Sequence, residues 1–99
     1  MDQRGNERHP VVIQGRYRTG RGVPRDVLVK DLSLTGCCIF DRFSTPNPGA
    51  YISIRIGSIG PISAKVQWRN NSDVGLAFDT PLHSSVLQHM RETIDGWRG

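Results

Sequence analysis

The chain has 99 residues and a formal net charge of +4. This length suits one domain with a single modest core and is too short for a catalytic domain together with a regulatory one. The sequence contains no run of about eighteen apolar residues, and its first ten residues lack the apolar segment of a secretory signal. We therefore expect a cytoplasmic protein that does not insert into a membrane.

The positive charge is concentrated near the N-terminus. Residues 1–25 contain six arginines and two acidic residues, whereas residues 26–99 contain seven basic and seven acidic residues. Eleven of the thirteen basic residues are arginine, and a guanidinium group binds a phosphate or a guanine edge through two parallel hydrogen bonds. An anionic partner is therefore expected. The alternative is a solvated basic surface that serves only solubility.

Alternating apolar residues and turn residues predict six short strands. In chain order they lie at about 9–18, 23–33, 37–40, 52–56, 62–68 and 74–78. The connections are short and rich in glycine, proline and asparagine. Because parallel strands need connections of a dozen residues or more, the pattern indicates an antiparallel barrel or sandwich.

One helix is expected at the C-terminal end, from Pro81 or Ser84 to about Asp95. Apolar residues in this segment fall at helical spacing and form one stripe, made of Leu82, Val86, Leu87, Met90 and Ile94. The stripe would cover one mouth or one side of the strands.

The sequence gives little support for catalysis or metal binding. Its three histidines are scattered, and no cysteine or carboxylate cluster has the spacing of metal ligands. The adjacent Cys37 and Cys38 should point to opposite faces of a strand, so we interpret them as reduced structural residues and not as a disulfide. We expect no enzymatic activity.

Arg4 and Arg8 frame the segment R-G-N-E-R. In an extended chain they would lie on the same side, roughly 13 Å apart at 3.3 Å per residue. Gly5 and Asn6 tolerate unusual backbone angles, so the segment can bend and bring both guanidinium groups to one ligand. Each group could bind a phosphate or the O6 and N7 atoms of guanine. The alternative is a frayed segment whose arginines lie in water.

Residues 31–36 read D-L-S-L-T-G. Asp31 and Ser33 would share one face of a strand, and Gly36 could adopt a positive φ where the strand turns. A carboxylate offers two acceptors to the N1 and N2 donors of guanine, with the serine hydroxyl beside it. The alternative is a turn in which both side chains bond only to nearby backbone.

Together the arginine pair and this hexad resemble the signature of the PilZ domain, a small bacterial β-barrel that binds the dinucleotide second messenger cyclic di-GMP. The V-Q-W-R-N segment at 66–70 and the V-G-L-A-F segment at 74–78 extend the resemblance over nearly the whole chain. It implies a single domain over residues 1–99. An arginine-bearing arm would occupy residues 1–9, a six-stranded antiparallel β-barrel residues 10–79, and a C-terminal α-helix residues 81–96.

The resemblance also implies the ligand-binding residues. The arginines would hold phosphate and guanine groups and the hexad would line the other guanine, which gives the set Arg4, Arg8, Asp31, Ser33 and Gly36. Trp68 is a further candidate, since a ring in that strand contacts a base in some members, although its alternation with Ile62 and Val66 indicates the core. The protein would need no cofactor. Its arm would become ordered on binding cyclic di-GMP and would then be read by an unidentified downstream protein.

Two other functions fit the size and charge of the chain. Small basic β-barrels also bind single-stranded nucleic acid. We do not expect this here, because most aromatic residues, among them Tyr17, Phe40, Trp68 and Phe78, can be accommodated in the core. The other alternative is a PilZ-like fold used only for protein contact, in which the motif pair would be broken; here both motifs are intact.

Overall fold

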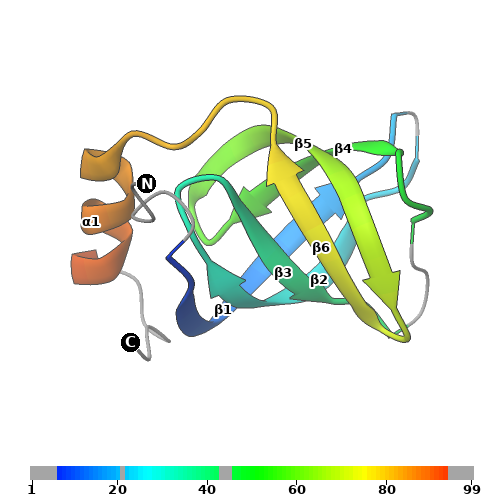
Figure 1. Cartoon of the computed structure of the whole chain (residues 1–99), viewed down its shortest axis with the longest axis horizontal. Coiled ribbons are helices and arrows are strands. Elements are labelled where there is room, and N and C mark those ends of the chain that lie inside the picture. The colour runs from blue at the N-terminus through cyan, green and yellow to red at the C-terminus, as the bar shows by residue number, and fades with distance from the viewer. Residues whose placement is uncertain (1–6, 21, 43–45, 94–99) are drawn as a thin grey trace.

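The computed structural model describes residues 7–20, 22–42 and 46–93. Within these ranges the chain forms six strands and one helix: β1 (His9–Arg18), β2 (Arg25–Leu32), β3 (Gly36–Phe40), β4 (Tyr51–Ile56), β5 (Ile59–Asn70), β6 (Asp73–Phe78) and α1 (Ser84–Thr93). All neighbouring strands are antiparallel, and the order β1-β2-β3-β6-β5-β4 closes into a barrel (Figure 1). The predicted six-stranded antiparallel β-barrel with a C-terminal helix is confirmed.

The hydrophobic core fills the inside of the barrel. Along β1 the residues are alternately buried and exposed from Val11 to Arg18, as expected for a strand with one face on the core and one in water. Each other strand contributes inward residues, and the cluster includes Val27, Val29, Leu32, Cys37, Ile39, Ile52, Ile54, Ile56, Ala64, Val66, Val74, Leu76 and Phe78. Burial of these side chains supplies the main driving force for folding.

Of the aromatic side chains in the described part of the chain, three lie outside this core. Tyr17 and Phe78 are buried as predicted. Phe40 and Trp68, which were also expected in the core, are 37% and 44% exposed, and Tyr51 is 65% exposed. The structure therefore leaves more aromatic surface accessible to a ligand than the alternation indicated.

Two of the irregularities in strand pairing bear on the site, and each comes from one extra residue. In β2, Val29 pairs with Ile39 and Asp31 pairs with Cys38, so Lys30 is left between the two pairs. In β5, Val66 pairs with Leu76 and Trp68 pairs with Gly75, so Gln67 is left over. An extra residue of this kind is a β-bulge, which shifts the following side chain to the other face of the strand.

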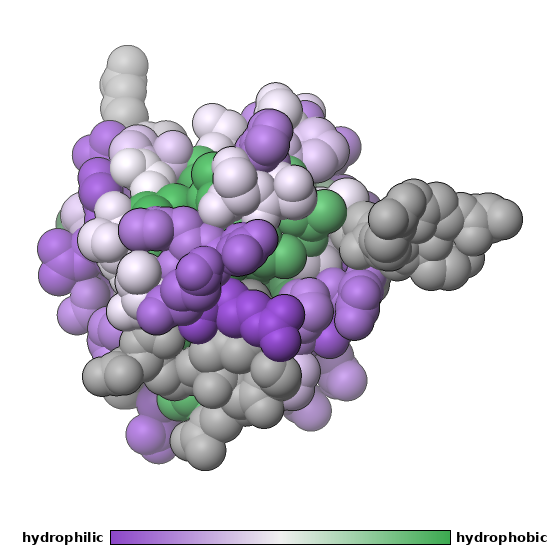
Figure 2. Space-filling view, turned by 90° about the vertical axis from the view of Figure 1, so that its left-hand side faces the viewer, coloured by the Kyte–Doolittle hydropathy of each residue, from purple (hydrophilic) through white to green (hydrophobic). Residues whose placement is uncertain are grey.

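Helix α1 covers one end of the barrel (Figure 1). Met90 is fully buried, and Leu82, Val86 and Leu87 pack against the core. Seen from the side on which α1 lies, the surface is largely hydrophilic, and hydrophobic residues are visible between the hydrophilic ones (Figure 2). His83 lies just before the helix and accepts a hydrogen bond from the Ser85 N–H through Nδ1 at 3.2 Å, as an N-cap does.

The predicted bounds differ from the observed ones at several ends. Strand β2 ends at Leu32 because Ser33 begins a turn, and β5 begins at Ile59 because the chain reverses over Gly57 and Ser58. The predicted helical residues beyond Thr93 lie outside the described part of the chain. Among the described residues, no helix has the length and apolar character needed to cross a membrane.

Candidate ligand-binding site

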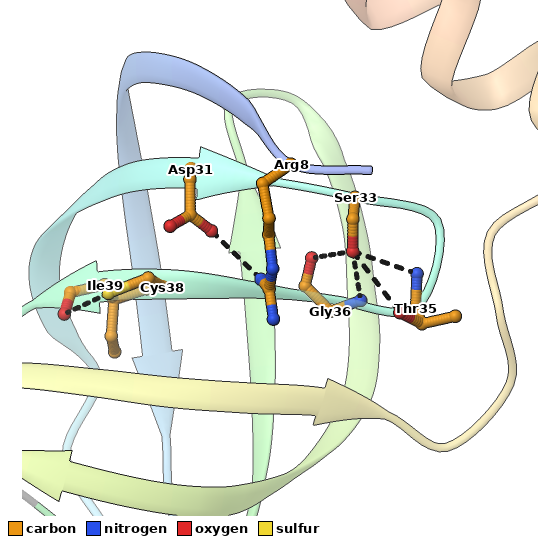
Figure 3. A network of polar contacts seen from close by, with 7 residues as sticks. All are labelled: Arg8, Asp31, Ser33, Thr35, Gly36, Cys38 and Ile39. Atoms are coloured by element: carbon orange, nitrogen blue, oxygen red, sulfur yellow. Dashed lines mark hydrogen bonds and ion pairs between the residues drawn. The ribbon is translucent and has the colours of Figure 1, made fainter. Parts of the chain in front are cut away.

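The two sequence motifs meet on the outer face of the barrel. Arg8 lies just before β1, which pairs with β2, and its Nη1 donates to Oδ1 of Asp31 at 3.0 Å (Figure 3). The side chains are 47% and 32% exposed. Both groups therefore remain accessible to a ligand, and together they offer guanidinium donors beside a carboxylate acceptor.

The bulge at Lys30 explains why Asp31 points outward. Val27 and Val29 are buried, and strict alternation would turn Asp31 inward with them. The extra residue reverses this order, so Lys30 and Asp31 both lie on the outer face while Leu32 is fully buried. A bulge thus keeps the carboxylate out of the core, where an unpaired charge would be costly.

Ser33 closes the turn between β2 and β3. Its hydroxyl accepts hydrogen bonds from the Gly36 N–H at 3.2 Å and the Thr35 N–H at 3.3 Å, and it donates to the Gly36 carbonyl at 3.2 Å (Figure 3). The residue is fully buried. The Ser/Thr turn that the sequence left open is therefore present at Ser33. A contact between its hydroxyl and a ligand remains a prediction.

Gly36 is required for a different reason from the one expected. Its φ is not positive, so the expected turn conformation was wrong. A Cβ at this position would lie less than 3.0 Å from the carbonyl oxygen of Leu76 on β6, because the backbones of β3 and β6 approach closely there. The glycine therefore allows close strand packing directly beneath the turn.

Trp68 lies on the same outer face as Asp31, in one row across four strands. Asp31 on β2 pairs with Cys38 on β3, Cys38 with Gly75 on β6, and Gly75 with Trp68 on β5. Three steps between strands, each about 4.8 Å, separate the two ends of the row by about 14 Å. Trp68 points outward because of the bulge at Gln67, which the alternation of β5 did not reveal.

The indole of Trp68 lies over Gly75. A Cβ on residue 75 would lie less than 3.0 Å from three atoms of this ring. Because Gly75 has no side chain, the indole can lie directly on the sheet, and we call this place the seat of Trp68. The residue remains 44% exposed. An indole held in this way offers a surface on which a nucleobase can stack. This role of Gly75 was not predictable from the sequence, because it depends on a partner residue from another strand.

Cys38 forms the floor of the row. It is 6% exposed on the outer face, whereas Cys37 is fully buried in the core, and both thiols are free. Burial raises the pKa of the Cys38 thiol, and the nearby Asp31 carboxylate raises it further. The floor of the site is therefore a neutral thiol and a glycine.

An ion pair borders the row. Nζ of Lys30 donates to Oδ1 of Asp73 at 2.9 Å, which links β2 to β6 across β3. This hydrogen bond raises the pKa of Lys30. The border therefore carries balanced charge.

The described chain thus brings together four of the six sequence-predicted site residues. Arg8, Asp31 and Trp68 lie on or over the outer face, with Ser33 in the adjoining turn. Gly36 supports this turn through its close approach to β6 and presents no side chain. Arg4 lies outside the described residues.

Comparison with known proteins identifies the family of this chain. The PilZ domain model matches residues 2–96, and no match was found among curated protein sequences. PilZ domains generally bind cyclic di-GMP and are typically receptor domains without catalytic activity. Because the match spans almost all of the 99 residues and the fold is the expected barrel, the chain belongs to the PilZ domain family.

Proposed function

We propose that this chain is a cyclic di-GMP receptor domain that binds its ligand on the outer face of β2, β3, β6 and β5. The observation that carries the proposal is the ion pair between Arg8 and Asp31, which joins the arginine motif and the hexad in one accessible place. Membership of a family that generally binds this dinucleotide supports it.

Each group in the row has a distinct task in this proposal. Asp31 accepts from the N1 and N2 donors of one guanine while it retains Arg8, since a carboxylate can accept about four hydrogen bonds. The remaining donors of Arg8, with those of Arg4, bind phosphate oxygens or a guanine edge. Trp68 stacks on a base. Ser33 and Gly36 hold the turn that fixes Asp31, and we retain the prediction that they also line the guanine.

Calorimetric titration with cyclic di-GMP tests the proposal, with cyclic di-AMP and GTP as comparison ligands. Arg8→Ala or Asp31→Ala should each weaken binding by about ten- to a hundredfold, the equivalent of about 1.5–3 kcal/mol for a hydrogen bond to a charged group. Cyclic di-AMP lacks the guanine donor pair and should bind poorly. Equal affinity for the two dinucleotides would show that only phosphate is recognised.

The barrel provides a matched control for these variants. Arg16 and Asp26 form a second exposed ion pair between β1 and β2, with the same 3.0 Å separation of nitrogen and oxygen. Asp26→Ala removes the same type of pair from outside the row, so its affinity for cyclic di-GMP should equal that of the wild type. An equal loss in Asp26→Ala and Asp31→Ala would indicate a general disturbance of the barrel and refute the site.

We further propose that ligand binding orders the arm at residues 1–9, and that a downstream protein reads this change. Gly5, Asn6 and the polar composition of the segment favour a transition in which charge-assisted contacts offset the entropy of ordering, about 1–2 kcal/mol per residue. Amide order parameters of residues 4–8 should rise on addition of cyclic di-GMP. An arm equally rigid with and without ligand would disprove the switch.

Single-stranded nucleic acid binding is the second candidate, because Trp68, Tyr51 and Phe40 are exposed. Their arrangement argues against it: Tyr51 has Lys65 Nζ at 5.6 Å from its ring centroid, and it pairs with β5 at a position away from Trp68. A protein that binds single-stranded nucleic acid should lose affinity as salt is added, with a slope of log K against log salt concentration of about 0.7 per phosphate contacted. Tight oligonucleotide binding with no response to cyclic di-GMP would reverse the ranking.

A further inference from the structure

A second cationic surface lies on the opposite part of the barrel wall, where β1 meets β4. Arg16 on β1 is the direct cross-strand partner of Arg55 on β4, and Arg18 is the partner of Ser53. These residues line a cleft of about 220 Å³ together with Pro24 and Pro61. We call it the arginine cleft. It shares no residue with the row from Asp31 to Trp68.

The charge in this cleft is only partly neutralised. Arg16 donates through Nε to Oδ1 of Asp26 at 3.0 Å, and both side chains are more than half exposed. Within residues 7–20, 22–42 and 46–93, Arg18 and Arg55 form no ion pair. Like charges directly opposite each other on a sheet destabilise it. A bound anion would relieve the repulsion between Arg16 and Arg55.

The dimensions of the cleft favour side chains of a protein as its occupant. Its volume of about 220 Å³ is below the roughly 300–1,000 Å³ of sites that enclose small molecules. Arg16 and Arg18 are two residues apart on one strand, about 7 Å. Carboxylates two residues apart in an extended segment have the same spacing, and each could form a paired hydrogen bond with one guanidinium group.

Nucleic acid fits this surface less well. Asp26 lies beside Arg16, and Asp79 lines the adjoining pocket that Arg18 shares, so the positive surface is short and suits a few carboxylates better than a long, continuous phosphate backbone. Of the described residues that line the arginine cleft, the one aromatic, Tyr17, is 3% exposed and offers no stacking surface. The exposed Tyr51 lines the adjoining pocket, where Nζ of Lys65 lies 5.6 Å from its ring centroid.

We propose that the arginine cleft is a docking surface for an acidic, extended segment of a partner protein. The inference rests on the proposed receptor function only in that a receptor needs a partner protein, and docking at this cleft does not itself report the nucleotide. Arg16, Arg18 and Arg55 would bind alternate carboxylates of the segment, and Pro24 and Pro61 would bound it. Because the cleft and the ligand row share no residue, the partner can dock whether or not the nucleotide is bound.

Fluorescence anisotropy with a labelled peptide of alternating threonine and aspartate tests this surface in the absence of nucleotide. Arg18→Gln and Arg55→Gln should each weaken binding about three- to fivefold, as expected for exposed ion pairs, and the double variant should weaken it about tenfold. Arg91→Gln, on the exposed face of α1 and outside the cleft, removes the same charge and should bind like the wild type.

Several results would overturn the proposal. Failure of the wild type to bind the aspartate peptide, equal binding of a peptide with asparagine in place of aspartate, or an equal loss in Arg91→Gln would each do so. Tighter binding of oligothymidylate, weakened by the same two cleft substitutions, would assign the surface to nucleic acid instead. The cleft variants should bind cyclic di-GMP like the wild type, so failure of the nucleotide site and failure of the cleft are separate observations.

Discussion

Replacement of Gly75 by alanine tests how much the close contact between Gly75 and the Trp68 indole contributes to stability and to ligand binding. The new methyl group would occupy the space of the indole ring, so one of the two must move. The ring is the movable partner, since Trp68 is 44% exposed and can rotate toward solvent. We therefore expect Gly75→Ala to fold, with Trp68 displaced from the sheet.

The cost to stability follows from the area that Trp68 buries. A residue 56% buried removes on the order of 140 Å² from water, given roughly 250 Å² for a tryptophan side chain. At about 25 cal/mol per Å² this is worth at most about 3–4 kcal/mol. A rotated indole keeps part of its contacts, so the free energy of unfolding should fall by about 1–2 kcal/mol.

Gly36→Ala provides the contrast. Its Cβ would meet the carbonyl oxygen of Leu76, a backbone atom within the β3–β6 ladder that cannot rotate away. The two strands would have to separate, so the loss should exceed about 3 kcal/mol, above the usual cost of overpacking. The two alanine variants thus distinguish a glycine that seats a side chain from one that the backbone requires.

Urea unfolding measures the loss of stability in each glycine variant, and titration with cyclic di-GMP measures the loss of ligand affinity. A Trp97→Phe background leaves Trp68 as the only tryptophan, so its fluorescence reports the indole directly. Gly75→Ala should shift this emission and weaken ligand binding about as much as Trp68→Ala does. In a Trp68→Ala background, followed by circular dichroism, Gly75→Ala should cost nothing. A loss of stability from Gly75→Ala in the Trp68→Ala background would show that Gly75 does not act by supporting the indole. Unchanged Trp68 emission and ligand affinity in Gly75→Ala would show the same.

Two further predictions concern titratable groups. Burial raises the pKa of Tyr17, and its hydrogen bond to Asp41 Oδ2 at 2.5 Å raises it further. The folded state therefore holds the Tyr17 proton more tightly than the unfolded state, so this stabilisation is complete below about pH 10 and declines above it. The alkaline decline measured by urea unfolding should be shallower in Tyr17→Phe; identical slopes would contradict the assignment. Burial also raises the pKa of Cys37 and Cys38, so both native thiols should react slowly with a disulfide reagent at pH 8, and bound cyclic di-GMP should slow Cys38 further. Mass spectrometry that found rapid labelling of native Cys37 would disprove this.

The local sequence was sufficient to predict the strands, because each carries its own alternation. The bulge in β2 was not predictable in this way. Val27 and Val29 have one parity and Leu28 and Leu32 the other, so the sequence does not say which set faces the core, and the structure buries Val27, Val29 and Leu32 by means of the extra residue. In β5 the apolar residues from Ile62 to Trp68 keep one parity. The outward position of Trp68 was therefore not predictable from its own strand.

The roles of the glycines depend on contacts between distant strands. Gly36 was assigned to a turn because positive φ is a local property, whereas the observed requirement comes from Leu76, forty residues later in the chain. Gly75 is required by Trp68 on the neighbouring strand. The requirement for glycine at both positions follows from the pairing of β3 with β6 and of β6 with β5. This pairing is a property of the closed barrel.

The structure also divides an arginine-rich segment that the sequence presented as one source of positive charge. Strand β1 begins near α1 and runs toward the other end of the barrel (Figure 1). Arg8 comes just before its first residue, whereas Arg16 and Arg18 lie near its last and are joined by Arg55 from β4. The intervening strand spans about 30 Å at 3.3 Å per residue, longer than two bound anionic groups could bridge. One part of the charge can therefore serve the nucleotide and the other a protein partner. Since the ligand row lies on β2, β3, β6 and β5 and the arginine cleft lies where β1 meets β4, we expect cyclic di-GMP and an acidic partner to bind simultaneously and without competition.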